Sequence, residues 1–136
     1  MQITRQADYA IRAMLYLARQ KEDVRSATSQ IADEQQIPPS FLAKIISQLS
    51  IAGLINTSRG ARGGVSLSRP ADDITLLDVV EAIDGPISLN VCSHSPGVCP
   101  FGEDCPIQPI WSDAEHELVS RLKSTNFAQL VKSRRN

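Results

Sequence analysis

The sequence has few aromatic residues and no long apolar run, and both absences exclude functions. Aromatic residues make up 4% of the 136 residues, and Trp111 is the only tryptophan, so stacking platforms for single-stranded nucleic acid are not expected. No apolar run approaches the roughly 18 residues of a membrane span, and the N-terminus lacks the features of an export signal. We therefore expect one globular domain in the cytoplasm, without membrane association.

Sequence patterns of catalysis are also missing. The chain contains no nucleophile elbow, phosphate-binding loop, HExxH pattern or paired carboxylates in a cleft-forming context, and its cysteines do not form a C-x-x-C pair. The sequence therefore predicts a protein that is not an enzyme.

The net charge of −1 conceals an uneven distribution of charge along the chain. Residues 1–69 carry nine Lys and Arg against five Asp and Glu, a net charge of +4, whereas residues 70–136 carry five basic and ten acidic residues, a net charge of −5. Such asymmetry fits a protein that turns one half toward a polyanion, although it also occurs in proteins that bind no nucleic acid.

The first half of the chain predicts a helix-turn-helix. After an apolar helix from Thr4 to Arg19, a short helix begins at Ser26 or Thr28, either of which can cap it, and Pro39 suits the first turn of the next helix. Two short helices of this kind can place the second in a DNA major groove, although an ordinary helical hairpin has the same pattern. The outer face of the second helix is expected to carry Ser40, Phe41, Ala43, Lys44, Ser47 and Gln48.

A β-hairpin with a basic, glycine-rich tip is expected next, with strands at 54–57 and 65–68. Arg59 and Arg62 supply planar donors for phosphate or for a narrow minor groove, and the glycines permit a close approach to another backbone. A solvated turn is the alternative interpretation. We expect a mostly α-helical winged helix-turn-helix domain with a small β-hairpin wing at residues 1–85, with its DNA contacts at Thr28, Pro39, Ser40, Phe41, Lys44, Arg59, Gly60, Arg62 and Gly63.

The C-terminal third predicts a long helix and a short last helix, in residues 110–136. Ahead of this region, Thr75 and Asp78 form a predicted capping box for a helix that ends at Gly85. Within residues 110–136, Thr125 can cap the last helix. The long helix carries an apolar stripe of Trp111, Ala114, Leu118 and Leu122. The stripe can fold back on its own domain, but we favour a two-fold homodimer, which also places two recognition helices about one DNA turn apart.

All three cysteines lie in residues 86–109, here called the cysteine segment. Cys92, Cys99 and Cys105 follow the spacing C-x6-C-x5-C, and an odd number of thiols without an export signal argues against a disulfide framework. The wide spacing favours an iron-sulfur cluster, either [2Fe-2S] or [4Fe-4S]. Zinc completed by His94, a thiol redox switch and inert thiols are the alternatives.

The residues together resemble the family of iron-sulfur cluster-binding winged-helix transcription regulators that includes the IscR, NsrR and RirA types. The resemblance lies in residues 1–4, 8–10, 37–42 and 59–64 and in the three cysteines ahead of a long helix. It implies a homodimeric regulator, a repressor in our interpretation, that binds a pseudo-palindromic operator in double-stranded DNA. It further implies that the three cysteines hold the cluster and that the cluster tunes DNA binding.

The fourth cluster ligand is where the sequence departs from the IscR type. That type uses a histidine three residues after the last cysteine, and this position is Gln108 here. NsrR-type proteins can use an acidic residue on the first helix of the partner subunit, and Asp8 occupies the matching place. Asp8 can equally form an ordinary i, i+4 ion pair with Arg12, and His94 or an exogenous thiol or water are further candidates. A zinc or thiol-switch regulator and a winged helix that binds only protein remain as rival functions.

Overall fold

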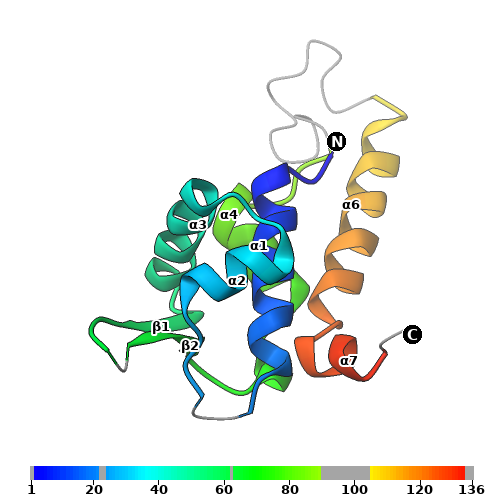
Figure 1. Ribbon diagram of the computed structural model, residues 1–136. Coiled ribbons are helices and arrows are strands. Elements are labelled where there is room, and N and C mark those ends of the chain that lie inside the picture. Colours follow the sequence, from blue (N-terminus) through cyan, green and yellow to red (C-terminus); the bar gives the residue numbers. More distant parts are fainter. Residues whose placement is uncertain (1, 22–23, 62, 90–104, 134–136) are drawn as a thin grey trace.

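Helix α1 is the axis around which the other elements are arranged (Figure 1). The computed structural model describes residues 2–21, 24–61, 63–89 and 105–133. Its elements are α1 (Arg5–Arg19), α2 (Thr28–Gln35), α3 (Pro39–Ile51), β1 (Ile55–Ser58), β2 (Gly64–Leu67), the 3-10 turn η1 (Ala71–Asp73), α4 (Leu76–Asp84), α6 (Gln108–Lys123) and α7 (Phe127–Lys132).

The buried face of α1 combines three alanines with four larger side chains, Tyr9, Met14, Tyr16 and Leu17. Ala7, Ala10 and Ala13 have no exposed surface, and their small side chains let the axes of neighbouring helices approach closely. Helices α2, α3, α4 and α7 all contact α1. The first helix is therefore the centre of the core, as its apolar sequence predicts.

The core joins both ends of the chain. Phe127 of α7 is 1% exposed and belongs to the same apolar cluster as Met14 of α1. The largest fully buried side chains are Phe127, Met14, Ile31, Leu42, Ile45, Leu49, Ile74, Val65 and Val79. Helix α7 thus covers α1 rather than extending away from it.

The predicted helix-turn-helix is present, but the predicted cap of its first helix is wrong. Neither Ser26 nor Thr28 caps α2, whose N-cap is Ala27 without a side-chain hydrogen bond. Ser26 is instead 4% exposed and exchanges two backbone hydrogen bonds with Val65, at 2.9 and 2.8 Å. Gln36 ends α2 in the left-handed conformation, at φ 54°, and Pro39 opens α3 as predicted.

The wing, residues 55–67, is a two-stranded antiparallel hairpin in which Ile55 lies opposite Leu67 and Ser58 opposite Gly64. Each strand is shifted by one residue from its predicted bounds. Leu54 does not join the first strand because its N–H donates to the Leu49 carbonyl at 3.0 Å and so closes the end of α3. On the other side of β2, Ser26 forms an isolated antiparallel bridge with Val65.

The capping box at the start of α4 is confirmed. Thr75 Oγ1 accepts from the Asp78 N–H at 3.1 Å, and the Asp78 carboxylate accepts from the Thr75 N–H at 3.0 Å. Thr125, by contrast, does not cap α7, because its hydroxyl donates to the Arg121 carbonyl at the end of α6. Asn126 caps α7 instead, in a second capping box.

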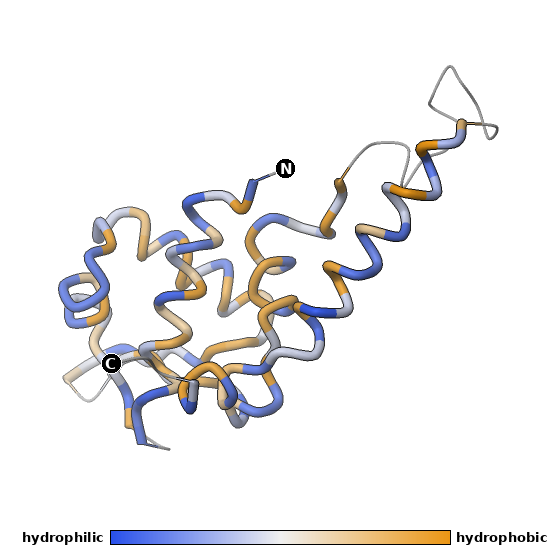
Figure 2. The backbone as a smooth tube through the Cα atoms, turned by 90° about the vertical axis from the view of Figure 1, so that its right-hand side faces the viewer, coloured by the Kyte–Doolittle hydropathy of each residue, from blue (hydrophilic) through white to orange (hydrophobic). Residues whose placement is uncertain are grey.

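Helix α6 packs on α4 with one side and projects from the rest of the molecule at its N-terminal end (Figure 2). It begins at Gln108, earlier than the predicted Ile110, because the proline at 109 is tolerated in the first turn. In the described ranges, no helix is both long and apolar enough to cross a membrane. The mostly helical architecture with a hairpin wing confirms the predicted fold class.

Gly64 is required by the close contact between the wing and residue 26. Its φ is +147°, and an added Cβ would lie 2.8 Å from the Ser26 carbonyl oxygen. Gly60 also has a positive φ, +102°, but faces open space.

We predict that Gly60→Ala lowers the free energy of unfolding by about 1 kcal/mol, from backbone strain alone. Gly64→Ala should cost about 2 to 4 kcal/mol, because overpacking is added to the same strain.

Urea denaturation followed by circular dichroism measures both values. Equal losses for the two variants would contradict the tight contact between the wing and Ser26.

Candidate nucleic-acid interface

The outward face of α3 carries two serines, one cation and, at its C-terminal end, the exposed apolar residue Ile51. Leu42, Ile45 and Leu49 are buried at spacings of three and four residues, so the opposite face carries Ser40, Lys44, Ser47 and Ile51 at spacings of four, three and four. All four are exposed. No described residue forms an ion pair with Lys44, so its ammonium group is available to a ligand.

Phe41 lies on the flank of this face, where α3 meets α1. Its ring centroid is 6.1 Å from that of Tyr9 with an interplanar angle of 57°, and 42% of its surface remains exposed. Tyr9 contacts a cation as well as the Phe41 ring, because the Arg12 guanidinium carbon lies over the Tyr9 ring, 4.8 Å from its centroid. Phe41 therefore both fixes α3 against α1 and borders the outward face.

Arg12 joins α1 to the end of α2. Its guanidinium donates to the Gln35 carbonyl at 3.0 Å and pairs with the Asp8 carboxylate at 3.1 Å. Since Gln35 is the last residue of α2, this contact satisfies an open carbonyl at the helix-turn-helix corner. The orientation of α2 and α3 on α1 is thus fixed by the Arg12 hydrogen bond and the Tyr9–Phe41 contact.

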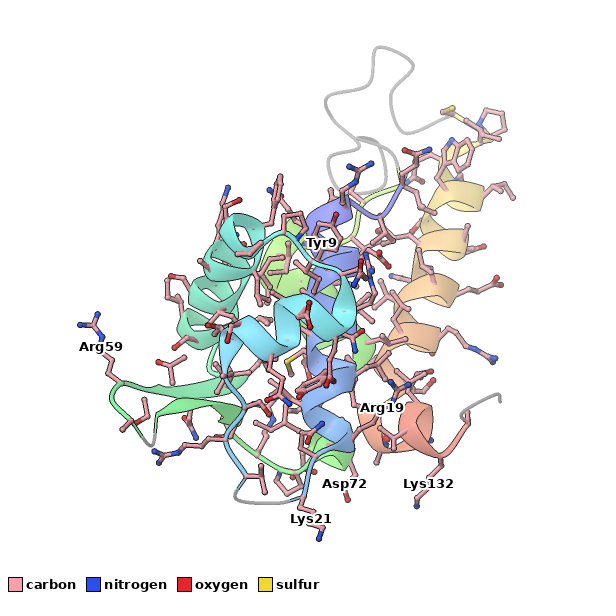
Figure 3. The ribbon with its side chains drawn as sticks, viewed as in Figure 1. Tyr9, Arg19, Lys21, Arg59, Asp72 and Lys132 are labelled. Atoms are coloured by element: carbon pink, nitrogen blue, oxygen red, sulfur yellow. The ribbon has the colours of Figure 1, made fainter. Side chains whose placement is uncertain are left out.

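The tip of the wing places Arg59 away from the body of the molecule (Figure 3). The Gly63 N–H donates to the Gly60 carbonyl at 2.9 Å and closes the turn, and a Cβ on Gly63 would collide with the Ser58 carbonyl oxygen. Gly63 is therefore required sterically in this turn, whereas Gly60 is favoured there only by its positive φ. The predicted contact Arg62 lies outside the described residues.

The wing and the helix-turn-helix form one continuous surface. A groove of about 310 Å³ is lined by Thr28 at the start of α2, Ile46 of α3, and Gly60 and Gly63 of the wing. Thr28, Pro39, Ser40, Lys44 and Arg59 are all exposed. The structure thus brings residues from three separate stretches of sequence to one surface.

Arg25 is a further basic residue beside the wing that the sequence analysis missed, although it does not line this groove. It is exposed, and its Cβ lies 3.2 Å from the position of a Cβ on Gly64. The pairing of Ser26 with Val65 fixes the Arg25 backbone beside the wing. A single bridge residue has no strand pattern in the sequence, so nothing in the pattern could have indicated this proximity.

A larger groove of about 770 Å³ lies between α2 and α3 and includes Asp33, Pro38 and Ala43. Its one charged lining residue is the acid Asp33. The charge of this groove does not suit phosphate. Among the described residues, we call Arg25, Lys44 and Arg59, which are exposed on or beside α3 and the wing, the cationic surface.

Cys105 is the one cysteine within the described residues. It is a free thiol of intermediate exposure just ahead of α6, and its carbonyl accepts from the Gln108 N–H at 3.3 Å. Cys92, Cys99 and His94 lie outside the described residues. Within the described part of the chain, no three metal-ligating side chains form a cluster.

Asp8 forms the ion pair with Arg12 that its spacing predicts, and its side chain is 60% exposed. One turn earlier, the Thr4 hydroxyl donates to the Asp84 carboxylate at 2.6 Å. The N-terminal end of α1 therefore lies beside the end of α4, where the cysteine segment begins.

The predicted dimer stripe of α6 is most exposed toward its N-terminal end. Trp111 is 37% exposed, with Ile107 and Ile110 at 47% and 57% beside it. Ala114, Leu118 and Leu122 are partly buried. The projecting part of α6 in Figure 2 thus presents apolar surface that the described residues of its own chain leave open.

Comparison with known proteins gives consistent matches over nearly the whole chain. Residues 3–133 match the family model described as Rrf2, iron-dependent transcriptional regulator. Protein aau3 of Rhizobium meliloti (strain 1021) is 34% identical over 135 residues, which cover 98% of this chain and 87% of that protein. Among solved structures, CymR (YrzC), the global cysteine regulator of B. subtilis, is 25% identical with a TM-score of 0.83 and 99% coverage of both chains. T. potens IscR is 23% identical with a TM-score of 0.78, covering 97% of this chain and 87% of that one.

The cationic surface predicts that Arg59→Ala and Lys44→Ala weaken binding to duplex DNA and reduce its salt dependence. Each lost phosphate contact should lower the slope of log K against log salt by about one unit. The matched control is Lys132→Ala, because Lys132 is exposed at the far end of the molecule from Arg59 (Figure 3).

Fluorescence anisotropy across a salt series, with one duplex selected by the protein from a random library, measures these slopes. Wild-type slopes in both Arg59→Ala and Lys44→Ala would remove the wing and α3 from the interface.

Proposed function

This chain belongs to the Rrf2 family of DNA-binding transcriptional regulators, and on that premise we propose that it is a homodimeric repressor whose operator affinity is controlled by an iron-sulfur cluster on its cysteine segment. The observation that carries the DNA-binding part is the single surface shared by α3, the start of α2 and the wing. Regulators of this family are not enzymes, and the proposed action is a change in DNA affinity.

In the proposed complex, α3 lies in the major groove and the wing contacts the backbone or the minor groove. The serine-rich face of α3 is small enough to approach base edges, and Lys44 is the cation that can donate to guanine O6 or N7. Arg59 extends from the wing tip, where its planar guanidinium suits phosphate or a narrow minor groove. Arg25, beside the wing, adds a second backbone contact.

A homodimer supports this arrangement because one winged helix reads only one half-site. We propose that the stripe of Trp111, Ala114, Leu118 and Leu122 packs against α6 of a second copy. The exposed apolar surface at Ile110 and Trp111 supports this pairing. Two recognition helices about 34 Å apart would then match a pseudo-palindromic operator.

The donor chemistry of the cysteine segment fits a cluster. Three thiols within fourteen positions are the soft ligands that iron-sulfur clusters take, and Cys105 is free and partly accessible. When bound, the cluster supplies an iron centre that responds to iron supply, oxygen or nitric oxide. Cys92, Cys99 and Cys105 would hold it.

Asp8 of the partner subunit is our proposed fourth ligand. Its ion pair with Arg12 is exposed and is worth only about 0.3 to 0.5 kcal/mol. The carboxylate could therefore leave Arg12 at little cost and bind a metal instead. The Thr4–Asp84 hydrogen bond places this end of α1 beside the start of the same chain's cysteine segment, so Asp8 of the same subunit is a further candidate. His94 and an exogenous thiol or water remain candidates.

A bare thiol switch is the second candidate function. The free thiol of Cys105 and the similarity to CymR, described as a global cysteine regulator, favour it. In that case oxidation of the thiols, rather than loss of metal, would change DNA affinity. A regulator whose thiols hold zinc is the third candidate.

The cofactor is tested by anaerobic purification followed by iron and sulfide analysis and an absorbance spectrum. We predict absorbance between roughly 300 and 450 nm, typical of cysteine-ligated iron-sulfur centres. Serine at any of Cys92, Cys99 or Cys105 should bleach or strongly destabilise this chromophore. The far-ultraviolet circular dichroism and the dimer should survive, because the described core contains none of the cysteines.

Full cluster occupancy in two of the three serine variants would refute shared ligation, and a colourless protein without sulfide would favour zinc or the thiol switch. In the same experiment, Asp8→Ala should shift the spectrum or speed its decay. An unaltered spectrum would leave Asp8 with its ion pair alone.

A further inference from the structure

Glu115 is a buried carboxylate on a helix that is otherwise largely exposed. It is 6% exposed, and among the described residues only Ser26 is also a buried polar side chain. Its helix neighbours His116 and Glu117 are both exposed. A carboxylate is rarely buried unless it is paired or hydrogen-bonded, so its position requires a partner.

That partner includes the backbone ahead of the cysteines. The Leu89 N–H donates to Glu115 Oε1 at 3.0 Å, across 26 residues of sequence. Ile87, two residues earlier, is 6% exposed, so the chain beyond α4 is held by an apolar side chain and by a charge-assisted hydrogen bond. Leu89 is three residues ahead of Cys92 in the sequence.

The other side of the cysteine segment is fixed to the same helix. Cys105 is hydrogen-bonded through its carbonyl to Gln108, the first residue of α6. From Gln108 to Glu115 the helix rises by about 10 Å. Helix α6 therefore sets the distance between the place where the chain leaves Leu89 and the place where it returns at Cys105.

We propose that Glu115 is a positioning residue for the cysteine segment: by accepting the Leu89 N–H, its carboxylate ties the chain ahead of Cys92 to the dimer helix. In this role the carboxylate acts through the backbone at Leu89. The contact concerns the protein with or without a cofactor, so its test is independent of the proposed cluster and of DNA binding.

Hydrogen exchange of the full-length, reduced protein, analysed by mass spectrometry, tests the contact at the Leu89 amide. Glu115→Met keeps a side chain of similar volume but leaves the Leu89 N–H without its acceptor, and an unsatisfied buried donor is destabilising. We expect the Leu89 amide to exchange on the order of tenfold faster in this variant, with a lowered thermal midpoint and an unchanged circular dichroism spectrum of the folded state. Glu115→Gln keeps an oxygen acceptor and should restore most of the protection.

Glu117→Ala is the matched control, because Glu117 lies on the same helix but is exposed, and it should leave Leu89 unchanged. Differential alkylation in the same samples provides a second readout. In Glu115→Met, labelling of Cys92 should rise relative to Cys105, which is attached directly to α6.

An unprotected Leu89 amide in the wild type, or equal exchange in the wild type and Glu115→Met, would overturn the proposal. So would a Cys92 to Cys105 labelling ratio that Glu115→Met leaves at the wild-type value. Because the wild-type amide is itself a test, the proposal remains falsifiable even if one variant does not fold.

Discussion

The close packing permitted by the alanine face of α1 is the constraint on which the rest of this structure depends. Ala7, Ala10 and Ala13 are completely buried, and α2, α3, α4 and α7 all lie against the helix that carries them. A larger side chain at any of these positions would push one of its neighbours outward. Helix α3 carries the candidate DNA-contact residues, and α4 leads into the cysteine segment. Both regions are therefore positioned by their packing on α1.

Packed helices connect the start of the cysteine segment to the helix-turn-helix. Helix α6 packs on α4, and α4 packs on both α1 and α3. On the other side of α1, the Arg12 hydrogen bond and the Tyr9–Phe41 contact hold the helix-turn-helix. A displacement of α6 relative to α4 would therefore reach α3 through packed side chains, because close-packed interiors transmit strain. If the cysteine segment holds a ligand as we propose, its effect could reach α3 by this route.

Much of the fold was predictable because its determinants are local. Apolar spacing defines α1 and α3, Pro39 opens α3, and Thr75 with Asp78 caps α4, all within a few residues of sequence. The errors occur where a residue serves a distant partner. Ser26 pairs with Val65 instead of capping α2, and the Thr125 hydroxyl ends α6, so that Asn126 caps α7.

The candidate site divides in the same way. The exposed face of α3 and the glycines of the wing follow from periodicity and turn chemistry, so Ser40, Lys44 and Arg59 could be found from sequence. Arg25 reaches the surface through one bridge, and Glu115 looks like a solvated helix residue until Leu89 is seen against it. Long-range backbone contacts of this kind leave no periodic pattern.

We propose that ligation of the cysteine segment holds the two winged domains of a dimer at the spacing of an operator. The most direct measurement compares DNA affinity of the cluster-loaded and cluster-free forms on one duplex at fixed salt. Loss of ligation spreads the dimer over geometries of which only a fraction fit both half-sites. We predict that the loaded form binds tighter by roughly 1 to 3 kcal/mol, a coupling of ordinary size. Equal affinity, or tighter binding by the cluster-free form, would contradict the account.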